Sequence, residues 1–200
     1  MTTQRQQHLD SSEAQSPVMI LVRHGRTTLN AAGRLRGHLD PPLDKVGIAD
    51  VARLADRLAP MLADRRPHRV LSSPLARATQ TAQAIADRAG LTVAIDDRLL
   101  DRDYGSWAGE LTGLVVERWG SIDDAPGVES RASIAARARG LLTEQVTDAP
   151  TVLVTHDAIL HAMLEQLDPS LADVPLDLTS WSLIGQVGQG PLTVISTNNR

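Results

Sequence analysis

LVRHGRTTLN, residues 21–30, joins the end of an apolar run to an arginine, a histidine and a glycine. The run VMILV at 18–22 has the length and composition of a strand that is buried on both faces. Such strands belong to parallel sheets with helices on both sides, and these sheets bind ligands beyond the carboxyl ends of their strands. Arg23, His24 and Gly25 therefore stand where a ligand site is expected.

Short apolar runs alternate with segments of helical period along the rest of the chain. This alternation predicts an α/β fold with a mostly parallel sheet. Ser73 and Pro74 are expected to form the N-cap and the first residue of the second long helix. Further strands are expected at 69–73, 91–95, 151–155, 181–187 and 192–197, and helices at 45–62, 74–90, 129–146 and 157–167.

The length of 200 residues suits one well-buried core, so we expect a single domain over residues 18–200. The polar stretch 1–17 lacks the apolar core of a signal peptide and is expected to be a disordered tail. No later apolar run approaches the roughly 20 residues that are needed to cross a bilayer. These features predict a cytoplasmic protein that does not engage a membrane.

Composition excludes several classes of site. The net charge of -4 gives no general attraction to nucleic acid, so any anion site must be a local cluster. The chain has no cysteine, which excludes disulfides, thiolate catalysis and cysteine-ligated metals. Its histidines form no close pair near carboxylates. We therefore expect no metal and no cofactor, whereas nothing in the sequence predicts the oligomeric state.

Basic side chains follow three of the expected strands at the edge where ligands bind. Arg23 and His24 end the first strand, Arg77 lies one turn into the helix after the second, and His156 follows the fourth. Guanidinium groups match phosphate oxygens and stay charged at any working pH. A neutral imidazole beside them can attack phosphorus. If these strands are neighbours, their ends form a site for phosphoryl transfer.

Phosphoryl transfer from an ester also needs an acid that protonates the departing alkoxide, and a carboxyl group is the usual donor. Asp101 and Asp103 lie in the polar stretch after the third strand, and Asp157 directly follows His156. The sequence does not place their oxygens, so all three remain candidates.

The assembled residues resemble the histidine phosphatase superfamily, also called the phosphoglycerate mutase-like family, from about Met19 to His161 and on towards the C-terminus. The resemblance implies a three-layer α/β/α sandwich, phosphoglycerate mutase-like in fold. Five segments carry it in order: LVRHGRTTLN (21–30), GRLRGHLDPPLDKVG (33–47), SSPLARATQTA (72–82), PGVES (126–130) and VLVTHDAIL (152–160).

The resemblance implies a role for each matching residue. In that family a histidine becomes phosphorylated while two arginines and a second histidine hold the phosphoryl group. The roles carry over to the nucleophile His24, to the phosphate pocket Arg23, Arg77 and His156, and to further contacts at Thr27 and Asn30.

Two positions depart from the family pattern. Asp101 stands in LLDRDYG where the family commonly has a glutamate, and aspartate is one methylene shorter. One branch of the family has its acid directly after the second histidine, which is the position of Asp157, so both aspartates stay open as the acid. Arg26 replaces the commoner glutamate and adds positive charge near the mouth of the site.

Four arginines are expected to surround that mouth and to favour a substrate with a second anionic group. They are Arg26, Arg34, Arg36 and Arg102.

These features predict a metal-independent phosphomonoesterase that hydrolyses a small phosphorylated metabolite through a phosphohistidine. A phosphoglycerate mutase is the first alternative, but the stretch from Asp101 to His156 is shorter than in cofactor-dependent mutases, which favours hydrolysis. A catalytically silent module that binds a phosphorylated ligand is the second alternative, because Asp101 departs from the usual acid.

Overall fold

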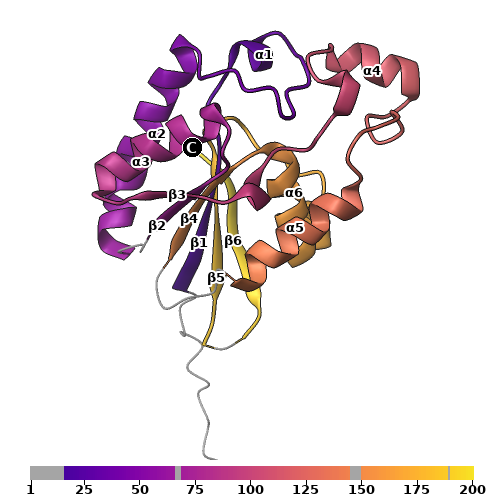
Figure 1. The fold of residues 1–200 in the computed structure, drawn as a ribbon. Coiled ribbons are helices and arrows are strands. Elements are labelled where there is room, and N and C mark those ends of the chain that lie inside the picture. The colour runs from indigo at the N-terminus through magenta and orange to yellow at the C-terminus, as the bar shows by residue number, and fades with distance from the viewer. Residues whose placement is uncertain (1–15, 66–68, 145–149, 189) are drawn as a thin grey trace, which may run out of the picture.

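The computed structural model describes residues 16–65, 69–144, 150–188 and 190–200. A six-stranded sheet in the order β3-β2-β4-β1-β5-β6 forms the middle layer (Figure 1). The first four strands in this order are parallel, and β5 and β6 continue the sheet as an antiparallel pair. The strands are β1 (Ser16–Arg23), β2 (Arg69–Ser72), β3 (Val93–Ile95), β4 (Thr151–Thr155), β5 (Trp181–Gln186) and β6 (Leu192–Asn199).

Helices cover both faces of the sheet, with α2 and α3 on one side and α5 and α6 on the other (Figure 1). This arrangement confirms the three-layer α/β/α sandwich. The helices are α1 (Thr28–Ala31), α2 (Lys45–Arg65), α3 (Ala76–Ala89), α4 (Thr112–Trp119), α5 (Arg131–Glu144) and α6 (Asp157–Leu167), with short 3-10 turns η1 (Asp97–Leu99), η2 (Gly105–Trp107) and η3 (Pro169–Leu171).

The strand β1 shows why its sequence is apolar without alternation. Met19 and Leu21 pack into the core beneath α5 and α6, whereas Ile20 and Val22 pack into the core beneath α2 and α3. All four side chains are at most 1 % exposed. A strand covered on both faces has no solvent side that would need polar residues.

The parallel register brings three strand ends together. Arg23 pairs with Thr155 across β1 and β4, and Ser72 pairs with Val154 across β2 and β4. One residue beyond the β1–β4 pairing, the His24 amide donates to the carbonyl of Thr155 at 3.0 Å. The residues after β1, β2 and β4 therefore meet at the carboxyl edge of the sheet, as the sequence predicts.

Two local predictions were wrong. The tail was predicted to cover residues 1–17, but Ser16 and Pro17 already belong to β1 and pair with β5. The predicted end of the tail is therefore two residues too far along the chain. Residues 1–15 lie outside the described part of the chain.

The N-cap prediction at Ser73 and Pro74 also fails, because α3 begins at Ala76 with Leu75 in the cap position and no side-chain cap bond. Instead, a carboxylate oxygen of Asp40 accepts from the amide of Ala76 at 2.6 Å. A loop distant in sequence thus satisfies the helix end.

No helix in the described part of the chain combines the length and the apolar composition of a membrane-spanning segment.

Candidate active site

His24 lies at the end of β1 with its side chain fully buried. Its Nδ1 lies 2.7 Å from the carbonyl oxygen of Gly25. Because a carbonyl can only accept, Nδ1 carries the proton and Nε2 keeps its lone pair. The backbone of the next residue therefore sets the tautomer that a nucleophilic imidazole needs.

Gly25 lets helix α2 approach this strand end closely. A Cβ atom at this position would come within 2.5 Å of Val51 Cγ2 and 2.9 Å of Leu43 Cδ2. Real Cβ atoms do not approach other atoms so closely, so a side chain would displace α2 or the backbone of His24.

His156 caps the sheet edge beside His24, and the centroids of the two rings lie 5.0 Å apart. Its Nε2 lies 2.8 Å from the hydroxyl oxygen of Ser73, which itself accepts from the amide of Leu75 at 3.4 Å. The Ser73 hydroxyl is thus free to donate its proton to Nε2. This leaves the proton of His156 on Nδ1, which has no hydrogen-bond partner in the described structure.

Both imidazoles are held neutral. Burial lowers the pKa of His24 well below its usual range, and the neighbouring His156 and Arg77 lower it further. Burial likewise lowers the pKa of His156, with further contributions from Arg77, Arg36 and Arg23. Cationic neighbours and a dry environment both oppose a protonated imidazole. The His24 imidazole is therefore neutral at neutral pH, with its Nε2 unprotonated.

Arg77 enters the site from the first turn of α3 and is fully buried. Its Nη1 donates to the carbonyl of Leu39 at 2.8 Å, and its Nη2 donates to the carbonyl of Gly37 at 2.8 Å and to Asp101 at 3.0 Å. Its Nε remains without a partner in the described structure. Three contacts thus hold the guanidinium group in one orientation, with one donor left over.

Arg23 is fixed in a similar way. Its Nη1 donates to the carbonyl of Leu176 and pairs with Asp157 at 2.9 Å. Arg36 donates from Nη1 to the carbonyl of Arg34 at 3.2 Å. Burial lowers the pKa of Arg23 and of Arg77, the paired aspartate of each opposes this effect, and the nearby charge of Arg36 lowers both pKa values further.

Five buried nitrogen atoms of these neighbouring residues have no hydrogen-bond partner among the described residues, and we call them the donor cluster; four are N–H donors and the fifth is the unprotonated Nε2 of His24. Buried polar groups in proteins are nearly always bonded, so a group of five indicates a ligand-binding site. Three guanidinium groups and two imidazoles match the oxygens and the phosphorus of a phosphoryl group. The atoms are Nε of Arg23, Nε of Arg36, Nε of Arg77, Nε2 of His24 and Nδ1 of His156.

The three candidate acids lie in different environments. Asp101 is 1 % exposed, and its Oδ2 lies 3.0 Å from Arg77 and 3.8 Å from Nδ1 of His156. The side chain of Asp157 is 40 % exposed and pairs with Arg23. Asp103 is exposed and accepts from the amide of Gly105 at 2.8 Å. The structure thus places Asp101 within the donor cluster, Asp157 at its border and Asp103 outside.

The remaining predicted contacts near His24 serve local structure. Thr27 and Asn30 form a reciprocal capping box at the start of α1, in which the carbonyl oxygen of the Asn30 side chain accepts from the amide and hydroxyl of Thr27. Arg26 pairs with Asp44 at 2.9 Å. In the described structure these three side chains bond to one another or to Asp44, and none of their hydrogen bonds involves the donor cluster.

Of the four arginines expected around the mouth, only Arg36 contributes an atom to the donor cluster. Arg34 donates to the carbonyl of Gly109 at 2.7 Å. Arg102 pairs with Asp123 at 2.6 Å and faces a neighbouring pocket instead.

Sequence reasoning did not find two supporting residues. The Ser73 hydroxyl orients His156, and the Thr81 hydroxyl accepts from the amide of Gly25 at 3.0 Å while donating to the carbonyl of Arg77 at 2.7 Å. Ser73 could have been found because it follows β2 at the edge where His156 follows β4. Thr81 lies four residues after Arg77, and this helical spacing indicates that both side chains lie on the same face of α3.

Within the described residues, no three histidine, aspartate or glutamate side chains gather in a way that could hold a metal ion. The donor cluster itself consists of three cationic guanidinium groups and two neutral imidazoles, which suits an anion.

Comparison with known proteins agrees with this geometry. The sequence profile described as histidine phosphatase superfamily (branch 1) matches residues 19–199. A glucosyl-3-phosphoglycerate phosphatase of Mycolicibacterium vanbaalenii is 34% identical over 202 residues, which cover 91% of this chain and 85% of the relative. Phosphoserine phosphatase 1 of Hydrogenobacter thermophilus is 34% identical over 160 residues, covering 72% of this chain and 73% of the relative.

The fold agrees as well. The structure of a mycobacterial glucosyl-3-phosphoglycerate phosphatase in complex with VO3 superimposes with a TM-score of 0.78 at 26% identity, covering 92% of this chain and 100% of the other.

Proposed function

The chain belongs to the histidine phosphatase superfamily, branch 1, and on that basis we propose that it is a metal-independent phosphomonoesterase that works through a phosphohistidine. The relatives named above are phosphatases of small phosphorylated metabolites. The observation that carries the proposal is the donor cluster, in which a neutral His24 is surrounded by unpartnered donors from three arginines and a second histidine.

In the proposed reaction the phosphoryl group of the substrate accepts from Nε of Arg23, Arg36 and Arg77 and from Nδ1 of His156. These contacts offset the negative charge that would otherwise repel a nucleophile. The lone pair of His24 Nε2 attacks phosphorus, and the bond between phosphorus and the ester oxygen breaks. The bond from Nδ1–H to the Gly25 carbonyl supports the positive charge that develops on the ring.

We assign Asp101 as the acid that protonates the leaving oxygen. In the structure its carboxylate pairs with Arg77. An incoming phosphoryl group takes over the charge of Arg77 and places negative charge next to Asp101, and both changes favour a protonated carboxyl. The same group then accepts a proton from the water that attacks phosphohistidine, which releases phosphate and restores His24.

Asp157 has a different part in this proposal. Its pairing with Arg23 at 2.9 Å and its exposed side chain suit a residue that orients Arg23. The shorter side chain of Asp101 still reaches the donor cluster because the backbone amide of Arg102 and the guanidinium group of Arg77 hold its two oxygens at 2.9 Å and 3.0 Å.

The direct test is phosphate release from 4-nitrophenyl phosphate in the presence of EDTA. We expect wild type to be active and His24→Ala to be inactive, and we expect acid-labile phosphate on wild type but not on the variant after rapid quenching. Activity lost with EDTA, or a fully active His24→Ala, would reject the proposal. Thermal unfolding of the variant with and without inorganic phosphate shows whether it remains folded and still binds the anion.

A further inference from the structure

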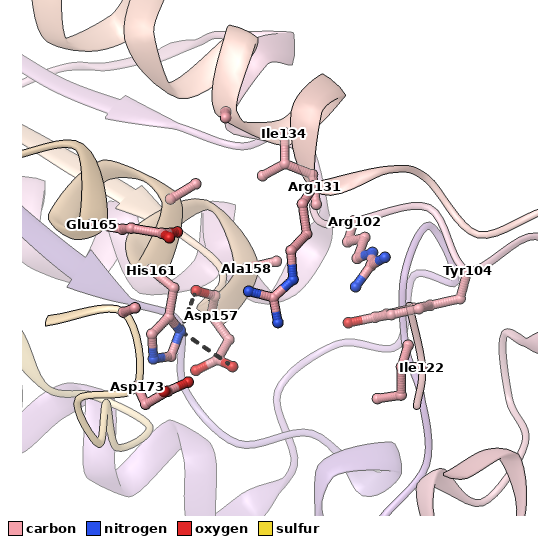
Figure 2. A pocket seen from close by; sticks show the side chains of 13 residues that line it. Arg102, Tyr104, Ile122, Arg131, Ile134, Asp157, Ala158, His161, Glu165 and Asp173 are labelled. Atoms are coloured by element: carbon pink, nitrogen blue, oxygen red, sulfur yellow. Dashed lines mark hydrogen bonds and ion pairs between the residues drawn. The ribbon is translucent and has the colours of Figure 1, made fainter. Parts of the chain in front are cut away.

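A second cavity of about 270 Å³ lies next to the donor cluster, between α5, α6 and the segment that follows Asp101 (Figure 2). Its lining includes Asp157, which binds Arg23 of the donor cluster. It also includes Arg102, whose amide binds Asp101, and Tyr104. The cavity therefore adjoins the site on the side of the proposed acid, where the leaving group of a phosphate ester must lie.

One wall of this cavity carries two paired arginines. Asp123 binds both, with Oδ1 2.6 Å from Arg102 Nη1 and Oδ2 2.7 Å from Arg131 Nε. A single carboxylate thus positions two guanidinium groups side by side. No hydrogen bond is assigned in the described structure to Arg131 Nη1 and Nη2, and Figure 2 shows this group reaching into the middle of the cavity.

The opposite wall carries acceptors. Glu165 and Asp173 both face the cavity, and their charges contribute to the raised pKa of Arg131, after the contacts with Asp123. Neither carboxylate has a hydrogen-bond partner among the described residues, and both residues are exposed. His161 also lines this wall, and its Nδ1 and Nε2 lie 2.9 Å and 2.8 Å from the carbonyl oxygens of Asp157 and Val174.

We propose that this cavity binds the alcohol part of the substrate and that this part is a polyhydroxylated, sugar-type group. The proposal rests on the function proposed above and adds the class of substrate to it. A hydroxyl group both donates and accepts, so neighbouring hydroxyls can donate to Glu165 and Asp173 and accept from Arg131 and Tyr104. The Tyr104 hydroxyl points into the cavity and has no bond assigned in the described structure.

Charge and size both favour this class. Arg102 and Arg131 share Asp123, and Asp157 is paired with Arg23. Counted with Glu165 and Asp173, the three arginines are opposed by four carboxylates, so the walls carry no excess of positive charge that would favour an anionic leaving group. Water occupies about 30 Å³ per molecule in the liquid, so the cavity has room for a ligand well beyond the size of a serine. The amino and carboxylate groups of a serine leaving group could pair with the carboxylates and arginines of the walls, but serine would fill only part of the cavity.

The experiment compares kcat/KM for hexose and pentose monophosphates, glycerol 3-phosphate, O-phosphoserine and 4-nitrophenyl phosphate. The aryl ester has no hydroxyls and serves as the reference. We expect at least one sugar phosphate to be the best substrate of wild type. Its kcat/KM relative to the reference should fall about tenfold or more in Arg131→Met and in the double variant Glu165→Gln with Asp173→Asn, as expected for lost hydrogen bonds to charged groups.

Arg139→Met is the matched control, since Arg139 lies on the same helix, is exposed and does not line the cavity. Its substrate ratios should equal those of wild type. A preference for O-phosphoserine that depends on Glu165 and Asp173 would overturn the proposal in favour of an amino-acid leaving group. Unchanged ratios in the Arg131 and Glu165 variants would overturn it as well.

Failure of the underlying function gives a different result. A wild-type protein that hydrolyses none of these esters, including the aryl ester, would reject the phosphatase and with it the subsite. Hydrolysis of the aryl ester without any preference among the others would reject the subsite alone.

Discussion

Replacing Asp101 with asparagine should destabilise the protein in the absence of phosphate. Added phosphate should restore part of the lost stability. Arg77 and Asp101 are 0 % and 1 % exposed, so the pair is not screened by solvent. Removing one partner of such a pair leaves a buried charge without its counter-ion, which costs about 3–5 kcal/mol. Asparagine keeps an oxygen that can accept from Arg77, so we expect the lower end, about 3 kcal/mol.

For a chain of this length each kcal/mol shifts the melting temperature by about 2–4 °C, so Asp101→Asn should melt about 6–12 °C below wild type. Inorganic phosphate at about 100 times its Kd stabilises a protein by about 2.7 kcal/mol. Phosphate supplies Arg77 with a new counter-ion and no longer meets the negative charge of Asp101. It should therefore bind the variant more tightly, and the difference in melting temperature should narrow as phosphate is added.

Differential scanning fluorimetry over a phosphate titration measures both effects. Asp124→Asn is the control, because Asp124 is exposed, and exposed positions usually change stability by no more than about 0.5 kcal/mol. Equal melting temperatures of wild type and Asp101→Asn without phosphate would refute the buried pair. If added phosphate left the difference in melting temperature between wild type and Asp101→Asn unchanged, phosphate would not replace Asp101 as the counter-ion of Arg77.

Three further predictions concern the donor cluster. Burial lowers the pKa of His24 and His156, so the unfolded chain binds more protons below its own pKa of about 6.5. The contribution of the two neutral histidines to the free energy of unfolding is thus complete above about pH 6.5. It declines as the pH falls, by up to about 1.4 kcal/mol per pH unit for each histidine. Urea unfolding at a series of pH values below about 6.5 measures how steeply the free energy of unfolding depends on pH, and this slope should be about halved in His24→Asn. A free energy of unfolding that does not change with pH in wild type would contradict the prediction. Arg36→Gln should weaken inorganic phosphate binding about 10–100-fold by calorimetry, from the loss of one charge-assisted bond, while Arg34→Gln should not, and equal Kd values would exclude Arg36 from the cluster. Asp157→Asn should lower kcat less than Asp101→Asn does, by stopped assays on an alkyl phosphate, and the reverse order would make Asp157 the acid.

Much of the fold follows from local pattern. The five-residue run before Arg23 is apolar at every position because both faces are covered, and that pattern is visible in the sequence. The convergence of His24, Arg77 and His156 also follows, because parallel strands all end at one edge. Their roles as nucleophile and phosphate ligands remain a prediction.

Other features depend on contacts between distant segments. Asp40 satisfies the first turn of α3, and no spacing in the sequence reveals that a loop residue replaces Ser73 there. The four arginines near the mouth look alike in sequence, yet only the fold decides that Arg36 reaches the cluster while Arg26 pairs with Asp44. The cavity beside the donor cluster needs α5 and α6 side by side, which places Arg131 opposite Glu165.

The way Arg77 is held has a consequence for how this enzyme can evolve. Its guanidinium group binds the carbonyls of Gly37 and Leu39 in one loop and the carboxylate of Asp101 in another. Loops are where a family usually diversifies its substrates. Here a change in either loop also moves the group that we propose to hold the phosphoryl moiety, so new substrate preferences in this protein should arise together with altered turnover rather than independently of it.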